Sequence, residues 1–311
     1  MKAIQIHHYG GKEVLQYEEC PMPDISEQQV LIKVIATSVN PVDWKIREGY
    51  LKEIIDYPLP FIPGWDVAGI VEKVGKQVTK FSLGDAVYSR PDIAKNGSYA
   101  EYIAVDADEV AKKPTTLSFI ESASLPLTGI TAWEMLFTAA NLQAGQTVLI
   151  HGGSGGVGSL AVQLAKHKDA KVISTTSEKN RAFVASLGAD EIIDYTSVDF
   201  KTVVKDVDAV IDTIGGQVQQ DSFEVLKPGG VLVSIVEVPD QEKAAQMNIR
   251  PEFVMIEPNA KILEQLSELV DQGHVRPIIA AEFSLKDISK AHELSQTGRA
   301  RGKIVIHVST P

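Results

Sequence analysis

Residues 147–158 read TVLIHGGSGGVG, and this stretch decides the fold. The apolar run TVLI is followed by five glycines, and a helical pattern begins at once over Val157–Lys168. Gly153, Gly155 and Gly158 therefore give the spacing GxGxxG between a strand and a helix, the setting that predicts a dinucleotide site. Glycine is needed because the turn is tight, backbone N–H groups approach a pyrophosphate, and helix and strand pack closely. The alternative interpretation is a glycine-rich connection that binds nothing.

The part of this loop expected to bind phosphate is Ser154, Gly155, Gly156 and Val157. These residues lie where the helix begins. The unpaired N–H groups of a helix N-terminus point at a ligand there and carry partial positive charge, so an anion is favoured.

The end of the second strand predicts which dinucleotide is bound. An NAD-binding chain usually has Asp or Glu there, about 20 residues after the first glycine. Here residues 174–177 read STTS and are followed by Glu178, Lys179, Asn180 and Arg181. Ser177, Lys179 and Arg181 favour the 2′-phosphate of NADPH as a charge-assisted hydrogen-bond acceptor, against the adverse charge of Glu178. The alternative is that Ser177 caps a helix whose first turn is solvated.

The pattern around the glycine loop indicates an α/β fold. After Pro126, strands alternate with helices of about ten residues, which indicates βαβ units on a doubly wound parallel sheet. The strands are expected at 147–150, 171–174, 191–194, 209–212 and 231–236, and the helices at 157–168, 178–187 and 218–226. A further amphipathic helix is expected at 259–272.

The first 125 residues have a different texture. Short β-type runs separated by Pro and Gly predict a coiled, largely antiparallel β domain, with strands at 30–34, 67–74, 86–88 and 100–105. Near the other end, a helix is expected at 285–297, and Lys303–Val308 has the alternating pattern of a strand. Because this last strand has no obvious place in the parallel sheet, we expect it to return to the first domain.

Composition and charge exclude several classes of protein. The chain has 311 residues, 44% of them hydrophobic and 23% charged, which is ordinary for a globular protein of about two domains. Lys+Arg 30 against Asp+Glu 41 gives a net charge of −11, which repels nucleic acid. The single cysteine, Cys20, excludes an intrachain disulfide and a zinc site of several thiolates. The start MKAIQIHHYGG lacks a signal-peptide pattern, and no long apolar run occurs, so we expect a cytoplasmic protein that does not enter the membrane.

Motifs along the whole chain carry a resemblance to a known family. They are SVNPVDWKIREGY at 38–50, PFIPGWDVAGIVEKVG at 60–75, GDAVY at 84–88, GSYAEY at 97–102, LPLTGITAW at 125–133, VLIHGGSGGVGSLAVQLAK at 148–166, LGADEIIDY at 187–195, LKPGGVLVSI at 226–235 and RGKIVI at 301–306. In this order they resemble the zinc-independent quinone oxidoreductase branch of the medium-chain dehydrogenase/reductase superfamily. The resemblance implies a GroES-like catalytic domain, residues 1–125 and 275–311, and a Rossmann NADP-binding domain, residues 126–274. It also implies a homodimer.

The chain differs from the zinc-dependent members of the superfamily at the positions of their zinc ligands, and this difference predicts that no zinc is bound. Zinc-dependent members have Cys and His ligands in the segment matching Ser38–Asp43 and a His-Glu pair in the segment matching Gly64–Asp66. This chain has Asn40, Asp43 and Trp65 at these places, with no ligand set for a metal that needs three protein ligands. The seven histidines are scattered, and we interpret them as surface or hydrogen-bonded residues.

Without a metal to polarise a carbonyl, hydride must pass to an acceptor that is already electrophilic, such as a quinone or an α,β-unsaturated carbonyl. The candidate catalytic residues are Tyr50, Asn40 and Asp43. The resemblance implies that Asn40 helps to build the nicotinamide end of the cofactor site, and that Tyr50 matches a tyrosine that donates a proton in related enoyl reductases. Two alternatives stay open: Tyr50 as a wall of the pocket, and Asp43 as a helix cap.

Other cofactor contacts are expected from the later strands. The resemblance places Thr131 by the nicotinamide carboxamide and Tyr195 by the adenosine. The carboxyl ends of further Rossmann strands line the cofactor crevice, and the residues at or just after these ends are Ile214, Ser234, Ile235 and Val236. Two other functions remain open: an enoyl-thioester reductase, and an NADPH-binding interaction protein with little turnover.

Overall fold

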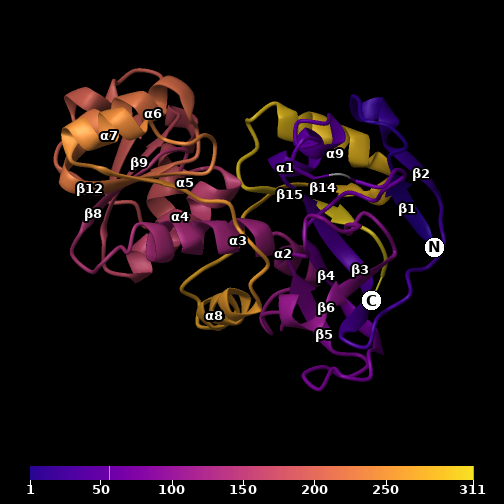
Figure 1. Ribbon diagram of the computed structural model, residues 1–311. Helices are drawn as coiled ribbons and strands as arrows, with labels where there is room; N and C mark the ends of the chain where they lie inside the picture. Colours follow the sequence, from indigo (N-terminus) through magenta and orange to yellow (C-terminus); the bar gives the residue numbers. More distant parts are fainter. Residues whose placement is uncertain (56, 311) are drawn as a thin grey trace. The chain divides into compact units, whose positions relative to one another are not determined.

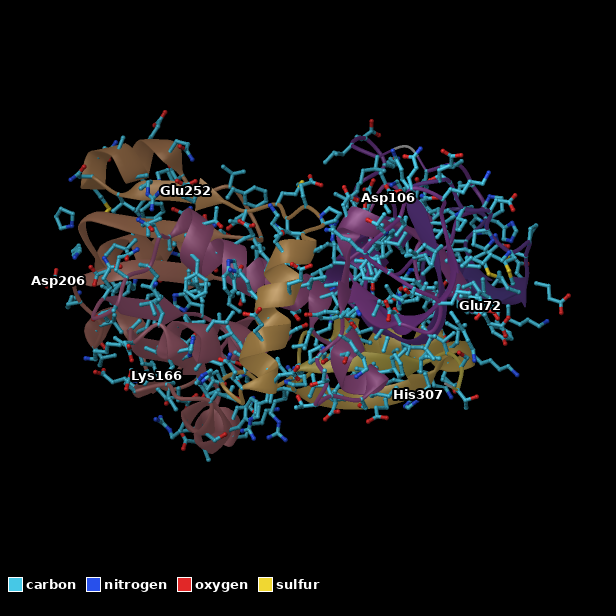
Figure 2. All side chains as sticks on the ribbon, turned by 90° about the horizontal axis from the view of Figure 1, so that it is seen from below. Glu72, Asp106, Lys166, Asp206, Glu252 and His307 are labelled. Atoms are coloured by element: carbon cyan, nitrogen blue, oxygen red, sulfur yellow. The ribbon has the colours of Figure 1, made fainter. Side chains whose placement is uncertain are left out.

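The computed structural model describes residues 1–55 and 57–310, which fold into two compact units. The first unit consists of Met1–Leu127, Glu257–Gly273 and Pro277–Pro311, and the second of Thr128–Ile256 and His274–Arg276. Side chains such as Glu72 and His307 of the first unit, and Lys166 and Asp206 of the second, point away from the ribbon into solvent (Figure 2).

The first unit is built on a seven-stranded sheet of order β14-β15-β3-β4-β5-β7, in which β6 also pairs with β3, beside a two-stranded sheet of β1 and β2. Its strands are β1 (Lys2–Gln5), β2 (Gln16–Glu19), β3 (Gln29–Val39), β4 (Val67–Val74), β5 (Ala86–Ser89), β6 (Tyr102–Asp106), β7 (Val110–Lys112), β14 (Ile279–Ser284) and β15 (Lys303–His307). All pairs except β14 with β15 are antiparallel, as the sequence predicts for this domain. The buried face is apolar, with Val30, Ile32 and Val34 of β3 packed on Val67 and Val71 of β4.

The last strand returns to the first unit, as expected. β15 pairs antiparallel with β3, with Ile304 opposite Val39 and His307 opposite Ala36. Figure 1 shows this yellow strand beside the indigo β3. The pairing places the start of β15 next to the end of β3, directly before the segment that carries the candidate catalytic residues.

The helices of the first unit have 5 to 12 residues. They are α1 (Pro41–Arg47), α2 (Phe119–Ala123), α8 (Ala260–Asp271) and α9 (Ile288–Gln296), with the 3-10 turns η1 (Lys12–Val14), η2 (Ala107–Glu109) and η7 (Leu285–Asp287). The expected boundaries put α8 in the Rossmann domain, whereas α8 packs against β7 of the first unit. The buried Tyr88 is one reason, because its hydroxyl donates to Leu263 O of α8 (2.5 Å).

The second unit is a six-stranded parallel sheet of order β10-β9-β8-β11-β12-β13. Its strands are β8 (Thr147–Ile150), β9 (Lys171–Thr176), β10 (Glu191–Asp194), β11 (Val207–Asp212), β12 (Leu226–Ser234) and β13 (Arg250–Phe253). Its helices are α4 (Gly156–His167), α5 (Arg181–Ser186), α6 (Gly216–Ser222) and α7 (Gln241–Met247), with the 3-10 turns η4 (Glu178–Asn180), η5 (Phe200–Thr202) and η6 (Phe223–Val225) and the π-helix η3 (Glu134–Ala139). The chain passes from the first unit to the second within α3 (Pro126–Trp133).

This topology decides where ligand-binding residues can gather. Ile150, at the end of β8, lies opposite Ser174 on one side and Ile211 on the other. Asp212, at the end of β11, lies opposite Ser234. Because the strands are parallel, the loops after them emerge at one edge of the sheet, which is where open α/β sheets bind ligands.

Candidate active site

The glycine loop of the second unit is held by close backbone packing. A Cβ atom on Gly158 would lie 2.2 Å from Gly152 O, and one on Gly153 would lie 2.1 Å from Ser174 Oγ. Gly152 adopts φ +73°, in the left-handed region that favours glycine. At Gly155 a Cβ atom would meet only Gly152 O, at 3.4 Å. The first and last glycines of the motif are therefore required by the fold, and Gly155 leaves room above the loop.

The loop ends at the N-terminus of α4. Gly155 is the N-cap residue, and no side chain caps the first turn. The first N–H groups of this helix of 12 residues thus have no partner from a capping side chain, and they present partial positive charge at the edge of the sheet. Ser154, Gly155, Gly156 and Val157 are half-buried here, which matches a loop that contacts a ligand on one side.

The hydroxyls after β9 are tied to the glycine loop. Thr176 Oγ1 donates to Ser154 Oγ (3.1 Å), and Asn180 Nδ2 donates to the hydroxyls of Ser154 (3.2 Å) and Ser177 (3.4 Å). Sequence reasoning missed Asn180, although it lies between the two predicted cations. It fixes Ser154 and Ser177 relative to each other.

The two predicted cations have different surroundings. Arg181 is engaged locally, since its Nε donates to Glu178 Oε2 (2.8 Å) and its Nη1 donates to Ile192 O (2.8 Å). This ion pair neutralises Glu178, the adverse charge noted in the sequence. Lys179 is exposed, and its ammonium makes no hydrogen bond or ion pair with residues 1–55 or 57–310. Lys179 is thus the cation free to meet an anion.

A buried carboxylate organises the loops after β11 and β12. Asp212 Oδ1 accepts from the N–H groups of Ile214 and Gly215 (both 2.9 Å), and Oδ2 accepts from Ser234 Oγ (2.9 Å). Ser234 is fully buried, and its hydroxyl serves this contact and the N–H of Val236 (3.2 Å). Asp212 was missed in the sequence because a single Asp at the end of a strand has no distinguishing pattern.

The other predicted cofactor residues differ in exposure. Tyr195 and Ile214 are 64% and 52% exposed, and Val236 is 40% exposed. Ile235 is half-buried, and Thr131 is buried on α3. The structure thus brings the residues after β8, β9, β10, β11 and β12 to one edge of the sheet of the second unit.

In the first unit, a buried cluster surrounds Asn40. Asp66 Oδ2 accepts from Ser38 Oγ (2.5 Å), Asn40 Nδ2 (2.8 Å) and Lys303 Nζ (3.1 Å). Asp66 Oδ1 accepts from the N–H of Leu127 (2.7 Å). Lys303 also donates to Asn40 Oδ1 and to Val39 O, the latter at 3.1 Å.

These residues do not fit a zinc ligand set. The segments that hold zinc ligands in zinc-dependent relatives here contribute Ser38, Asn40 and Asp66, and each of them is already hydrogen-bonded within the cluster. The ammonium of Lys303 brings a positive charge to this place, which opposes a metal cation. Within residues 1–55 and 57–310 no three His, Cys, Asp or Glu side chains gather as a metal site. No step is therefore assigned to zinc.

A second buried chain of hydrogen bonds leads to Asp43, and its direction follows from the chemistry of its members. Arg47 Nη1 lies 3.1 Å from His292 Nδ1, and a guanidinium only donates, so Nδ1 accepts. The proton of the neutral His292 is then on Nε2, which donates to Tyr99 Oη (3.2 Å). Tyr99 donates in turn to Asp43 Oδ2 (2.6 Å), which also accepts from the N–H of Asn40 (2.8 Å).

Burial shifts the pKa values of this chain. Desolvation raises the pKa of Asp43 to about 7, against the opposing effects of Tyr99, the Asn40 N–H and Lys303. Desolvation, and next the charge of Arg47, lower the pKa of His292 to about 3, so this histidine is neutral. Asp43 Oδ1 is buried and has no hydrogen-bond partner in the described part of the chain. The alternative of Asp43 as the N-cap residue is wrong, because Asn40 caps α1; Asp43 is the third residue of the helix, and its carboxylate binds the N–H of Asn40.

Tyr50 lies apart from this chain. It follows α1, its N–H donates to Lys45 O (2.9 Å), and its ring meets that of Trp44 edge-on at 6.2 Å. The side chain is 65% exposed, and its hydroxyl has no partner among the residues that the structure describes. The hydroxyl is therefore available to a ligand, whereas the amide of Asn40 and one oxygen of Asp43 are already engaged.

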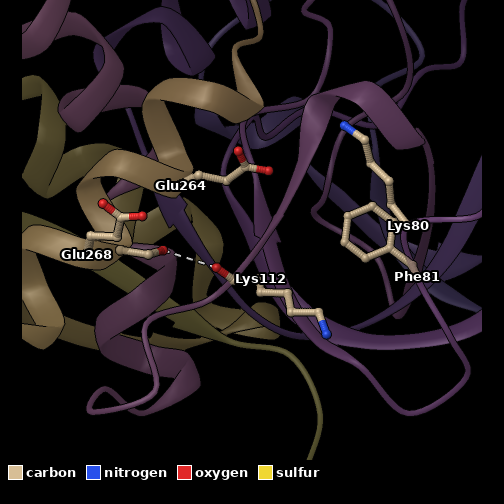
Figure 3. Close-up of a pocket in the computed structure, with 6 residues that line it drawn as sticks. Lys80, Phe81, Lys112, Glu264 and Glu268 are labelled. Carbon is tan, nitrogen blue, oxygen red and sulfur yellow. Dashed lines mark hydrogen bonds between the residues drawn. The ribbon is translucent and has the colours of Figure 1, made fainter.

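A surface pocket of about 510 Å³ in the first unit contains none of the predicted site residues (Figure 3). It lies beside α8, where Ser267 Oγ donates to Lys112 O (3.0 Å), and its other lining residues are Lys80, Phe81, Glu264 and Glu268. Its mixed charges are those of an ordinary solvated surface.

Sequence reasoning missed most of the buried residues around the candidate catalytic segment. Tyr99, His292 and Lys303 lie far from residues 38–50 in the sequence, and only the fold brings them there. The interpretation of the histidines as surface or hydrogen-bonded residues is correct for His292, whose ring nitrogens bind Tyr99 and Arg47. Asp66, Tyr99 and Lys303 lie inside quoted motifs, but nothing in those motifs shows what they contact.

Comparisons with known proteins agree with this architecture. Residues 26–115 match the family model of the alcohol dehydrogenase GroES-like domain, and residues 187–306 match that of zinc-binding dehydrogenases. The chain is 41% identical to a 2-methylene-furan-3-one reductase of Solanum lycopersicum and 37% identical to a chloroplastic NADPH-dependent alkenal/one oxidoreductase of Arabidopsis thaliana. Each match covers 99% of this chain and 79% of the relative. Among solved structures, the quinone oxidoreductase from Coxiella burnetii is similar with a TM-score of 0.92 and 38% identity, over 99% of both chains.

The two-part architecture and the glycine loop define a nucleotide-binding dehydrogenase or reductase. The chain belongs to the medium-chain dehydrogenase/reductase superfamily, in its quinone oxidoreductase branch. The family inferred from the motifs is confirmed, and so is the fold class. Among the described helices, none has the length and apolar character needed to cross a bilayer.

Proposed function

We propose that this protein is an NADPH-dependent oxidoreductase that transfers hydride to a quinone or to an α,β-unsaturated carbonyl compound. The observation that carries the proposal is the uncapped N-terminus of α4 behind a glycine loop whose first and last motif glycines the fold requires, while Gly155 leaves room for a ligand. The family and the relatives named as alkenal/one and quinone oxidoreductases support the acceptor class.

The second unit supplies the cofactor site in this proposal. The N–H groups at Gly155–Val157 bind the pyrophosphate, and Ser154 and Ser177, oriented by Asn180, face the adenosine ribose. Lys179 binds the 2′-phosphate, because it is exposed and has no partner among the described residues, while Arg181 holds Glu178 and β10. Tyr195, Ile214, Ile235 and Val236 line the site with apolar surface.

The first unit supplies the groups that handle the acceptor. Bound NADPH supplies the hydride. Tyr50 donates a hydrogen bond to the oxygen on which negative charge develops, and it protonates the enolate when the acceptor is an enone. Its 65% exposure lets the phenolate regain the proton from solvent, so that one hydride and one proton are added across the double bond. A quinone needs less help, because solvent protonates the hydroquinone oxygens.

Three further properties belong to this proposal. We propose that hydride transfer needs no zinc, since the residues at the places of the zinc ligands are occupied with one another and with Lys303. A homodimer is expected from the family resemblance. A location in the cytoplasm stays a prediction, and relatives of this chain include chloroplastic and mitochondrial proteins.

One assay tests the proposal against its alternatives. NADPH oxidation is followed at equal concentrations of a quinone, an alkenal, an enone and an enoyl thioester, and each is repeated with NADH and after dialysis against a chelator. We expect turnover of the quinone and the enones, higher kcat/KM with NADPH, and no loss after chelation. Preference for the enoyl thioester would point to the alternative reductase. Tight NADPH binding without turnover of any acceptor would point to an interaction protein.

A further inference from the structure

Lys303 is the first residue of β15 and is buried, with 5% of its surface exposed. A buried ammonium is costly unless hydrogen-bond acceptors replace the water it has lost. Lys303 has as many acceptors as an ammonium has donors: Val39 O at 3.1 Å, Asp66 Oδ2 at 3.1 Å and Asn40 Oδ1. Its charge is balanced by Asp66, which is fully buried.

The amide of Asn40 has one possible orientation in this cluster. Asp66 accepts only, so the group that faces it at 2.8 Å is Nδ2, and Lys303 donates only, so the group that faces it is Oδ1. Turning the amide over would place two donors against each other and two acceptors against each other. An ammonium on one side and a carboxylate on the other therefore hold the side chain of Asn40.

The same contacts fix the start of α1. Asn40 is the N-cap residue of α1, and Val39 is the last residue of β3. Lys303 binds both residues through one atom, at the place where β15 pairs with β3. The segment that begins here leads through Asp43 to Tyr50.

We propose that Lys303 is a positioning residue for the reaction: its buried ammonium, bound by Val39, Asn40 and Asp66, sets the orientation of the Asn40 amide and of the segment that carries Tyr50. The inference rests on the proposed function for its catalytic consequence. Its structural part, the orientation of Asn40, stands without it. Lys303 does not contact the acceptor, because its three donors are used within the cluster.

The positive charge of Lys303 is needed to compensate the negative charge of Asp66, because both groups are buried together. Asp66 Oδ2 already accepts from two neutral groups, Ser38 Oγ and Asn40 Nδ2. Removing Lys303 alone leaves a buried carboxylate without a counter-charge, which is strongly unfavourable, whereas removing both charges is much better tolerated. This difference separates a loss of fold from a loss of positioning.

The experiment compares Lys303→Met, Lys303→Gln and the double variant Lys303→Met/Asp66→Asn with wild type and with Lys33→Met. Lys33 lies on β3 and its Nζ donates to Thr310 O (2.9 Å), so it controls for loss of a lysine from the same sheet. The readouts are the thermal unfolding midpoint, kcat and KM for an accepted quinone and enone, and the two Nδ2 proton signals of Asn40 in a nitrogen–proton NMR spectrum. Loss of these signals in Asn40→Asp identifies them.

We expect Lys303→Met to lower kcat by about 100-fold, because a misplacement of about 1 Å can reduce the rate by that factor. The same variant should lower the thermal unfolding midpoint and shift or broaden the Asn40 signals. Lys303→Gln retains a donor and should recover part of kcat. The double variant should recover the midpoint but not kcat, because the amide introduced by Asp66→Asn can oppose the amide of Asn40 with a donor. Lys33→Met should match wild type in every readout.

Two results would overturn the inference. Unchanged Asn40 signals in the folded Lys303 variants would show that the ammonium does not orient the amide. If the double variant recovered kcat as well as the unfolding midpoint, the role of Lys303 would be only to compensate the negative charge of Asp66. A wild type that reduces no acceptor would instead refute the proposed function, while the NMR comparison would still decide whether Lys303 orients Asn40.

Discussion

The glycine loop of the second unit and the buried cluster of the first are built in opposite ways. The loop is formed by contiguous residues and presents backbone N–H groups. It can pack closely because Gly153 and Gly158 have no side chains. The cluster around Asn40, together with the chain of hydrogen bonds that ends at Asp43, uses charged and polar side chains from α1 and its N-cap, the residue before β4, β15 and α9. A local backbone site loses function when atoms are added to it, whereas a buried network of side chains loses function when one member is removed.

The largest expected effect separates the two kinds of glycine in the loop. Gly158→Val places side-chain atoms against Gly152 O, where a Cβ atom alone would lie at 2.2 Å, so the second unit should fail to fold. Gly155→Ala meets only Gly152 O at 3.4 Å, so the fold should survive while NADPH affinity falls by at least about tenfold, since the methyl group occupies the path of the pyrophosphate. Circular dichroism and calorimetric titration with NADPH measure the two effects.

Two results with Gly155→Ala and Gly158→Val would contradict this prediction. Unchanged NADPH affinity in Gly155→Ala would mean that the pyrophosphate does not approach this residue. A stable Gly158→Val protein would mean that the loop has freedom that its packing does not show.

Tyr50 tests whether the exposed group of the first unit performs chemistry. Tyr50→Phe keeps the ring against Trp44 and should leave stability and NADPH binding nearly unchanged. If the hydroxyl donates a proton in the transition state, kcat/KM for enones should fall by about 10²–10⁴-fold, and that for quinones by much less. Steady-state kinetics with both acceptors gives the comparison, and full enone activity would leave Tyr50 as a wall of the pocket.

Asp43, at the end of the second buried chain of hydrogen bonds, gives the first unit a pH dependence that the glycine loop lacks. Its pKa is raised by burial from 3.8 to about 7, so its contribution to stability is complete below the ordinary pKa of 3.8 and is lost as the pH rises through 7. Asp43→Asn retains an oxygen that accepts from Tyr99 and from the Asn40 N–H, and it has no charge to bury. Relative to wild type, its free energy of unfolding should therefore increase by about 2–3 kcal/mol between about pH 5 and about pH 8.

Urea unfolding of both proteins at these two pH values measures the change. His292, with its pKa lowered by burial to about 3, is present in both proteins, and its contribution cancels in the comparison. A constant difference between wild type and Asp43→Asn would show that Asp43 does not change its charge in this range.

The smallest expected effect concerns the two cations at the edge of the second unit. Lys179→Ala should weaken NADPH binding by about 1–3 kcal/mol through the loss of one charge-assisted hydrogen bond, and leave NADH unchanged. Arg181→Ala should change the ratio of the two affinities less, because Arg181 is engaged with Glu178 and Ile192. Equal effects of both changes on NADPH would indicate that Arg181 leaves its local partners when the cofactor binds.

The sequence by itself determined the second unit well. Strand period, helix period and the glycine spacing are local properties, and the parallel sheet then places the residues after β8, β9, β10, β11 and β12 at one edge. The motifs also determined the family and the return of the last strand to the first unit. The boundary at α8 depended instead on a contact, that of Tyr88 with Leu263, for which the sequence has no signal.

Only the tertiary structure decided which side chains of the first unit work together. Asn40 and Lys303 are 263 positions apart, and Tyr99 and His292 are 193 apart, so no spacing rule connects them. After β9, one partner of Arg181 is local, since Glu178 lies three positions before it, whereas Ile192 O belongs to β10 and reaches Arg181 only in the fold. Local motifs can be read from the chain because their atoms are neighbours in sequence. A buried charge is stabilised only by the partners that the fold brings to it, and those partners determine its protonation and its orientation.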